Sequence, residues 1–262
     1  MTIGPVTRLA PVEDPAVRLF MFHHAGGSHL LYRGWAAEFP DDWEICLFDA
    51  PGRGQVQALP LIQGCAELVE YFNGALAPWL DRPFAFFGHS MGGLIAYELT
   101  RTLVRKGGPL PCLLGISSYG APCGEAGADG TRHLLSDDEL RDWLRHTGGC
   151  PPKLLDDDAV WRKFGPVFRS DFTLVDTWPP PRDAAPLPVP VVAFGGHDDA
   201  LVSADRLLAW AAHTNDFRGL DMYEGSHFYL TDHRRSIAGR IMDLLSRTSR
   251  TPPPWQDFAG QA

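Results

Sequence analysis

Short apolar runs along the chain alternate with longer segments in which apolar residues recur every three or four positions. The short runs are residues 17–22, 44–48, 84–87, 112–116, 189–194 and 220–223. Continuous apolar runs of this length are typical of strands buried on both faces of a parallel sheet. The longer segments predict helices at 65–80, 91–106, 203–214 and 231–246. This alternation predicts an α/β fold with a mostly parallel, doubly wound sheet.

One connection is far longer than a plain crossover between parallel strands requires. Residues 119–188 lie between two predicted strands, so they are expected to form structure of their own. We interpret them as an inserted helical lid, called the lid segment below. The rest of the chain is expected to belong to the same single domain, 1–262, with a flexible tail at 251–262 that begins with a run of prolines.

Three helices are expected inside the lid segment. The first begins at Ser136, which forms a capping-box pattern with Glu139, and ends near Gly148. A second helix is expected at 157–164, ending before Pro166, because proline removes a backbone donor and disturbs the preceding turn. The apolar spacing then predicts a third helix within 167–178.

A candidate nucleophile lies between a predicted strand and a predicted helix. Residues 88–92 read Gly-His-Ser-Met-Gly, directly after the run 84–87. This is the strand, turn and helix context of the G-x-S-x-G nucleophile elbow in α/β-hydrolases. A chance Gly-Ser-Gly turn is the alternative. The pattern predicts the α/β-hydrolase fold, with Ser90 as the catalytic nucleophile.

A serine hydroxyl needs a base to take its proton, and this fold presents a histidine after its last strand. His227 has that position, although a solvent-exposed loop histidine is the alternative. The third member should follow the strand before that one, where Asp198 and Asp199 are adjacent. We choose Asp199 for its spacing from Gly196, and Asp198 stays open because the sequence does not give side-chain directions.

The oxyanion of an acyl-transfer intermediate needs preorganised donors, usually the amide after the nucleophile and one from an early loop. The first is expected from Met91. The second is assigned to the Ala25 amide, in the His-His-Ala-Gly-Gly-Ser segment 23–28 after the first predicted strand. Three histidines in or beside this segment could suggest a metal site, but adjacent residues rarely converge on one ion, so no metal or cofactor is expected.

Composition narrows the possible classes of function. A net charge of −9 argues against broad binding to nucleic acid or anionic membranes. No apolar run approaches the length of a membrane span, and the first residues lack an export-signal pattern, so a soluble cytoplasmic protein is expected. The five cysteines are scattered and suggest free thiols rather than a disulfide framework. A monomer is favoured.

The motifs together resemble the type II thioesterases that accompany modular polyketide synthases and nonribosomal peptide synthetases. The matching segments cover nearly the whole chain and are 24–28, 49–54, 87–93, 168–171, 195–199 and 225–228. His23 is a departure, since the family often has proline there. The resemblance implies hydrolysis of acyl groups from the phosphopantetheine arm of acyl or peptidyl carrier proteins. General carboxylesterase or lipase, acyltransferase and non-catalytic docking module are the rival functions.

Two further groups of residues have alternative interpretations. The apolar lid residues could line an acyl tunnel or simply pack the lid helices onto the domain. They are Leu140, Trp143, Leu144, Trp161, Phe164 and Phe168. Arg53 and Arg169 could contact phosphopantetheine or an acidic carrier protein, although a lone arginine more often has a structural role.

Overall fold

The predicted apolar runs pair into one sheet in the computed structural model, which describes residues 4–122, 130–181 and 184–248. The strand order is β1-β3-β2-β4-β5-β6-β7. β1 pairs with β3 antiparallel, and every other pair is parallel. The strands are β1 (Val6–Leu9), β2 (Val17–Phe22), β3 (Trp43–Phe48), β4 (Phe84–His89), β5 (Leu114–Ser117), β6 (Leu187–Gly196) and β7 (Thr214–Tyr223).

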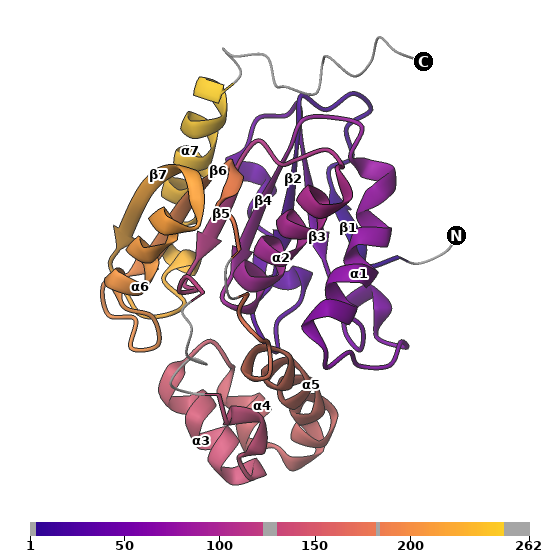
Figure 1. Cartoon of the computed structure of the whole chain (residues 1–262). Helices are drawn as coiled ribbons and strands as arrows, with labels where there is room; N and C mark the ends of the chain where they lie inside the picture. Colours follow the sequence, from indigo (N-terminus) through magenta and orange to yellow (C-terminus); the bar gives the residue numbers. More distant parts are fainter. Residues whose placement is uncertain (1–3, 123–129, 182–183, 249–262) are drawn as a thin grey trace.

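Helices cover both faces of this sheet (Figure 1). One face carries α1 (Cys65–Leu76), α2 (Met91–Lys106) and α6 (Ala204–Leu208). The other carries α7 (Leu230–Thr248) with the 3-10 turns η1 (His29–Tyr32) and η2 (Ala36–Glu38). Further 3-10 turns are η3 (Gly54–Val56), η4 (Ala77–Trp79) and η6 (Ala209–Ala212). The sheet is therefore doubly wound.

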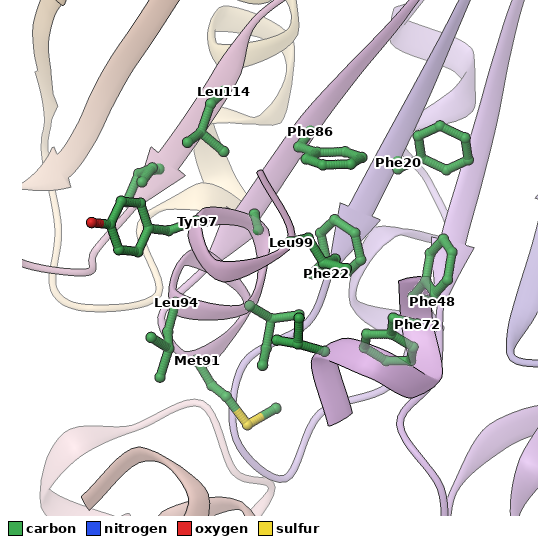
Figure 2. Packing of buried hydrophobic residues seen from close by; sticks show 14 of the residues in the cluster. Phe20, Phe22, Phe48, Phe72, Phe86, Met91, Leu94, Tyr97, Leu99 and Leu114 are labelled. Carbon is green, nitrogen blue, oxygen red and sulfur yellow. The ribbon is translucent and has the colours of Figure 1, made fainter. Parts of the chain in front are cut away.

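Alternating side chains of each strand supply two separate cores. On β2, Phe20 and Phe22 pack with α1 and α2, whereas Leu19 and Met21 pack with α7. Figure 2 shows the first core, where aromatic rings from the strands meet Phe72 of α1 and the apolar face of α2. Such burial on both faces explains why these strands are continuous apolar runs. The carboxyl ends of the parallel strands lie side by side at one edge of the sheet.

The lid segment forms helices at one end of the molecule, as Figure 1 shows. They are η5 (Arg132–Leu134), α3 (Asp137–Thr147), α4 (Pro152–Asp156) and α5 (Asp158–Asp176). The capping box predicted at the start of the first lid helix is present: Ser136 Oγ accepts from the Glu139 amide, and the Glu139 carboxylate accepts from the Ser136 amide. These helices form a small apolar cluster of their own.

The helix break predicted before Pro166 is wrong. α5 runs without interruption from Asp158 to Asp176, with Pro166 inside it. The residue before this proline is Gly165, which has no Cβ to clash with the proline ring, so the helical conformation is accessible there. Burial of one helix face, including Trp161 and Phe168, then outweighs the lost backbone hydrogen bond.

The amino-terminal strand β1 was not predicted, because residues 1–15 show no clear apolar period. It is a half-buried edge strand of four residues, and its position is set by antiparallel pairing with β3. The tail expected at 251–262 lies outside the described residues.

Candidate active site

Ser90 lies at the sharp turn between β4 and α2. β4 ends at His89 and α2 begins at Met91, and Ser90 connects them with a backbone φ of 55°. A non-glycine residue adopts this left-handed conformation at a cost of roughly 1–3 kcal/mol, so the surrounding structure must hold it. The Ser90 amide donates to the Ser117 carbonyl at 2.7 Å. The turn thus fixes the direction of the serine side chain.

Two glycines allow the backbone to approach itself closely around this turn. A Cβ on Gly88 would lie 2.0 Å from the carbonyl oxygen of Gly92. A Cβ on Gly92 would lie 2.0 Å from the carbonyl oxygen of Phe22. Only glycine fits at either position without backbone movement. The first turn of α2 is therefore packed directly against the ends of β2 and β4.

His227 and Asp199 are joined by a hydrogen bond. His227 lies in the loop between β7 and α7, and its Nδ1 is 2.9 Å from Oδ2 of Asp199, which follows β6. The other carboxylate oxygen accepts from the amides of Leu201 (2.9 Å) and Val202 (3.2 Å). The two side chains are 7% and 0% exposed. Asp199 thus holds the imidazole through Nδ1, which leaves Nε2 as the ring nitrogen that is not used in this bond.

Asp199 is held in its charged form. Burial by itself would raise the pKa of this carboxyl group, but the hydrogen bond and charge of His227 and the amide of Leu201 outweigh burial and lower the pKa. The neighbouring Asp198 is exposed, and its backbone amide donates to the Gly225 carbonyl at 3.0 Å. Of the two carboxylates left open by the sequence, Asp199 contacts the histidine.

The loop after β2 forms a tight turn whose amides face different partners. The Gly27 amide donates to the His24 carbonyl (2.9 Å), so Ala25 and Gly26 are the central turn residues. Gly26 is the third residue of this four-residue turn and has a positive φ of 76°, a conformation that glycine adopts readily at that position. Its amide donates to Asp171 at 2.7 Å. Within the described residues, the Ala25 amide has no hydrogen-bond acceptor.

The Met91 amide likewise has no hydrogen-bond acceptor among the residues that the structure describes. It belongs to the first turn of α2, where backbone N–H groups have no partner within the helix. Ser90, His227 and Ala25 line the same open pocket. The predicted nucleophile, the predicted base and the loop that carries one predicted oxyanion donor therefore face the same pocket.

Lid side chains form much of the cavity wall. Trp143, Leu144 and Phe168 line it, and these three were considered for an acyl tunnel on sequence grounds. Phe172 also lines it and was missed, although it lies one turn beyond Phe168 on α5. The remaining candidates do not line this cavity. Leu140 and Trp161 are buried in the lid cluster, and Phe164 is 37% exposed.

Three further histidines near the cavity are neutral at neutral pH. Burial, together with the charge of Arg53, lowers the pKa of His23 to about 4. Burial also lowers the pKa of His24 to about 4 and, assisted by the charges of His227 and His24, places the pKa of His89 well below its usual value. None of the three therefore adds positive charge beside His227 under ordinary assay conditions.

Both arginines considered for substrate contact have structural partners. Arg53 forms a two-atom ion pair with Asp171 and is 7% exposed. Arg169 donates to the carbonyls of His133 (2.7 Å) and Leu135 (2.6 Å) within the lid segment. The role of Asp171 was also missed, because its partners are distant in the chain.

The described parts of the chain contain no group of three or more potential metal-ligating side chains arranged to hold a metal ion. Over the same residues, no helix is both long enough and apolar enough to span a bilayer.

Comparison with known proteins identifies relatives over nearly the full length. A family profile described as "Thioesterase domain" matches residues 17–245. The thioesterase PikA5 of Streptomyces venezuelae is 33% identical over 248 residues, which cover 94% of this chain and 87% of that protein. The gramicidin S biosynthesis protein GrsT of Aneurinibacillus migulanus is 34% identical over 221 residues, covering 83% and 84%.

Solved structures show the same similarity. BorB, described as a type II thioesterase from the borrelidin biosynthetic cluster, is 33% identical with a TM-score of 0.81, covering 92% of this chain and 97% of that one. YbtT, described as a type II thioesterase from the yersiniabactin pathway, is 26% identical with a TM-score of 0.83, covering 94% and 99%.

Proposed function

The chain belongs to the thioesterase family as a type II thioesterase, and from this membership we propose that it hydrolyses acyl groups from the phosphopantetheine arm of acyl or peptidyl carrier proteins. Its role in a polyketide or nonribosomal peptide pathway is to release stalled or aberrant acyl groups. The membership confirms the resemblance described from the motifs, and the α/β-hydrolase fold is confirmed with it.

In the first half of the proposed reaction, the Ser90 hydroxyl attacks the thioester carbonyl while Nε2 of His227 takes its proton. Asp199 keeps the proton of the imidazole on Nδ1 and stabilises the imidazolium that forms. The amides of Ala25 and Met91 donate to the oxyanion of the tetrahedral intermediate. The carbon–sulfur bond then breaks, and the phosphopantetheine thiol leaves with the proton from His227.

In the second half, water replaces the thiol. His227 takes a proton from the water as its oxygen attacks the acyl-enzyme carbonyl, and the same proton returns to Ser90 Oγ when the acid is released. The acyl chain lies in the cavity against the lid residues Trp143 and Phe168 during both steps. Phosphopantetheine arrives with the carrier protein, and the proposed reaction uses no metal or redox cofactor.

The observation that carries this proposal is the single cavity shared by Ser90, His227 and the apolar lid wall, with Asp199 bonded behind the histidine. The test compares one acyl group, butyryl, on a holo carrier protein, on N-acetylcysteamine and on p-nitrophenol. The carrier substrate is expected to have a kcat/KM at least about tenfold above that of the N-acetylcysteamine thioester, because remote binding energy is used at the reacting centre.

Two outcomes would replace the proposal. A clear preference for the simple ester with no effect of the carrier would assign the chain to the general carboxylesterases. Transfer of the butyryl group to a second thiol or amine, instead of release of free butyrate, would assign it to the acyltransferases.

The rate of hydrolysis is expected to fall as the pH is lowered from 8 to 5, because an imidazolium at position 227 cannot accept the serine proton. Burial lowers the pKa of His23 and His24 to about 4 and that of His89 well below its usual value, and the pKa of Asp199 is also lowered, so these groups titrate mainly below this range. The acid limb of log kcat/KM should therefore have a slope of about one. A flat profile, or a slope near two, would contradict this assignment.

A further inference from the structure

A lid residue contacts the loop that carries the proposed oxyanion donor. Asp171 of α5 accepts the Gly26 amide at 2.7 Å through its Oδ2 atom. Three residues earlier on the same helix, Phe168 covers Gly26 so closely that an added Cβ would lie 1.9 Å from its ring. α5 therefore packs on this loop and bonds to it at the same point.

An arginine from a third segment holds the aspartate in place. Arg53, in the connection after β3, donates from Nη2 to Oδ1 of Asp171 at 2.7 Å and from Nη1 to Oδ2. Because two nitrogens of the planar guanidinium contact two carboxylate oxygens, they fix the orientation of the carboxylate as well as its distance, which a single contact cannot do. Nη1 also lies 3.4 Å from the Gly27 carbonyl. The pair joins α5 to the loops after β2 and β3.

The peptide unit between Ala25 and Gly26 is held at both of its ends. Its N–H donates to Asp171, and its carbonyl accepts from His24 Nδ1 at 2.8 Å. The preceding carbonyl, that of His24, accepts from the Gly27 amide and from His23 Nδ1 (2.7 Å). With these groups occupied, the Ala25 N–H is left as the free donor of the turn.

We propose that Asp171, held by Arg53, is a positioning residue for the oxyanion hole: it fixes the Ala25–Gly26 peptide so that the Ala25 amide faces the cavity. This inference rests on the proposed use of that amide as an oxyanion donor. A buried ion pair is in general a weak source of net stability, because desolvation offsets the attraction between the charges. We therefore expect loss of Asp171 to act mainly on the position of the Ala25 amide rather than on stability. In this proposal, α5 helps to hold the oxyanion-hole loop in place.

The test measures kcat and KM of Asp171→Asn and Asp171→Glu on butyryl-N-acetylcysteamine and on p-nitrophenyl butyrate. Asparagine removes the two-atom pairing, and glutamate keeps the charge but moves the accepting oxygen. Both variants are expected to lower kcat about tenfold to a hundredfold on both substrates, since a donor displaced by about 1 Å loses most of its effect. KM should change less than about threefold, and the acid limb of the pH profile should not move.

Glu44→Gln is the matched control. Glu44 and Arg18 form an ion pair with exposed fractions of 0% and 7%, close to the 1% and 7% of Asp171 and Arg53, but at the opposite ends of the strands. This variant should lower the melting temperature and leave kcat within about twofold of wild type. Butylboronic acid forms a tetrahedral adduct with the serine. Its affinity for the Asp171 variants should fall in proportion to their loss of kcat, whereas its affinity for Glu44→Gln should equal that for the wild type.

Wild-type kcat in a folded Asp171→Asn or Asp171→Glu protein would overturn the proposal. So would a loss of kcat in the control as large as that in the Asp171 variants. If neither Asp171 variant folds, Arg53→Lys decides the question, with a drop in kcat of about threefold to tenfold expected and unchanged kcat contradicting the proposal. Hydrolysis of p-nitrophenyl butyrate forms the same kind of oxyanion. The positioning role of Asp171 can therefore be tested even if the carrier-bound thioester is not the preferred substrate.

Discussion

Replacing Ser90 with alanine is expected to reduce hydrolysis of butyryl-N-acetylcysteamine by about 10⁴-fold or more. The variant lacks the oxygen that forms the acyl-enzyme, and His227 and the oxyanion donors cannot replace it, since members of such a catalytic unit act together. Loss of one hydroxyl at a half-buried position should leave the melting temperature within a few degrees. The measurement is steady-state release of thiol, with mass spectrometry of the quenched protein to detect a butyryl adduct.

Ser226→Ala is the control for this experiment. Ser226 is exposed and precedes His227, so it is the nearest serine in sequence to the proposed base. Its replacement should leave turnover and the butyryl adduct unchanged. Turnover of Ser90→Ala within tenfold of wild type would exclude this serine as the nucleophile. If the wild-type protein hydrolysed none of the acyl substrates, a docking module would be favoured instead.

The second large effect is expected for Asp199→Asn, which should lower kcat by about 10³- to 10⁴-fold. The amides of Leu201 and Val202 donate to Oδ1, so an asparagine oxygen stays there and its NH₂ group faces His227. The histidine then accepts at Nδ1 and carries its proton on Nε2, where it cannot take the proton of Ser90. The measurement is kcat at pH 8 with saturating thioester.

The adjacent Asp198→Asn provides an equal change of charge without the change of tautomer. Asp198 is exposed, so this variant should retain kcat within about twofold. A larger loss in Asp198→Asn than in Asp199→Asn would mean that Asp198 orients the histidine during turnover.

The sequence predicted those parts of the fold that depend on neighbouring residues. The parallel strands β2 to β6 were visible because they are largely buried on both faces and therefore contain continuous apolar runs. Of the edge strand β7, which is half-buried along most of its length, only residues 220–223 were predicted. The position of Ser90 was visible because the glycines, the strand and the helix that create its turn are all local. His227 followed from its order in the chain relative to the last strand.

Features that depend on tertiary contact were not predictable in the same way. The choice between Asp198 and Asp199 depends on the backbone path after β6, which turns one carboxylate toward His227. Pro166 interrupts a helix by its own chemistry, and only the burial of the α5 face and the glycine before it make the helix continuous. Arg53 and Asp171 are 118 positions apart, so no local pattern connects them.

The pocket is lined partly by loops at the carboxyl ends of the strands and partly by the lid helices, and these two parts can change separately. The reacting groups come from loops at the ends of the sheet, whereas Trp143, Leu144, Phe168 and Phe172 come from α3 and α5. If the acyl chain binds here as proposed, exchanging side chains on the inner surface of these helices would alter which acyl chains fit and leave proton transfer unchanged. On the proposed function, changes in α3 would alter the preferred chain length with little loss of rate, whereas changes in α5 are constrained by the hydrogen bond between Asp171 and the loop after β2.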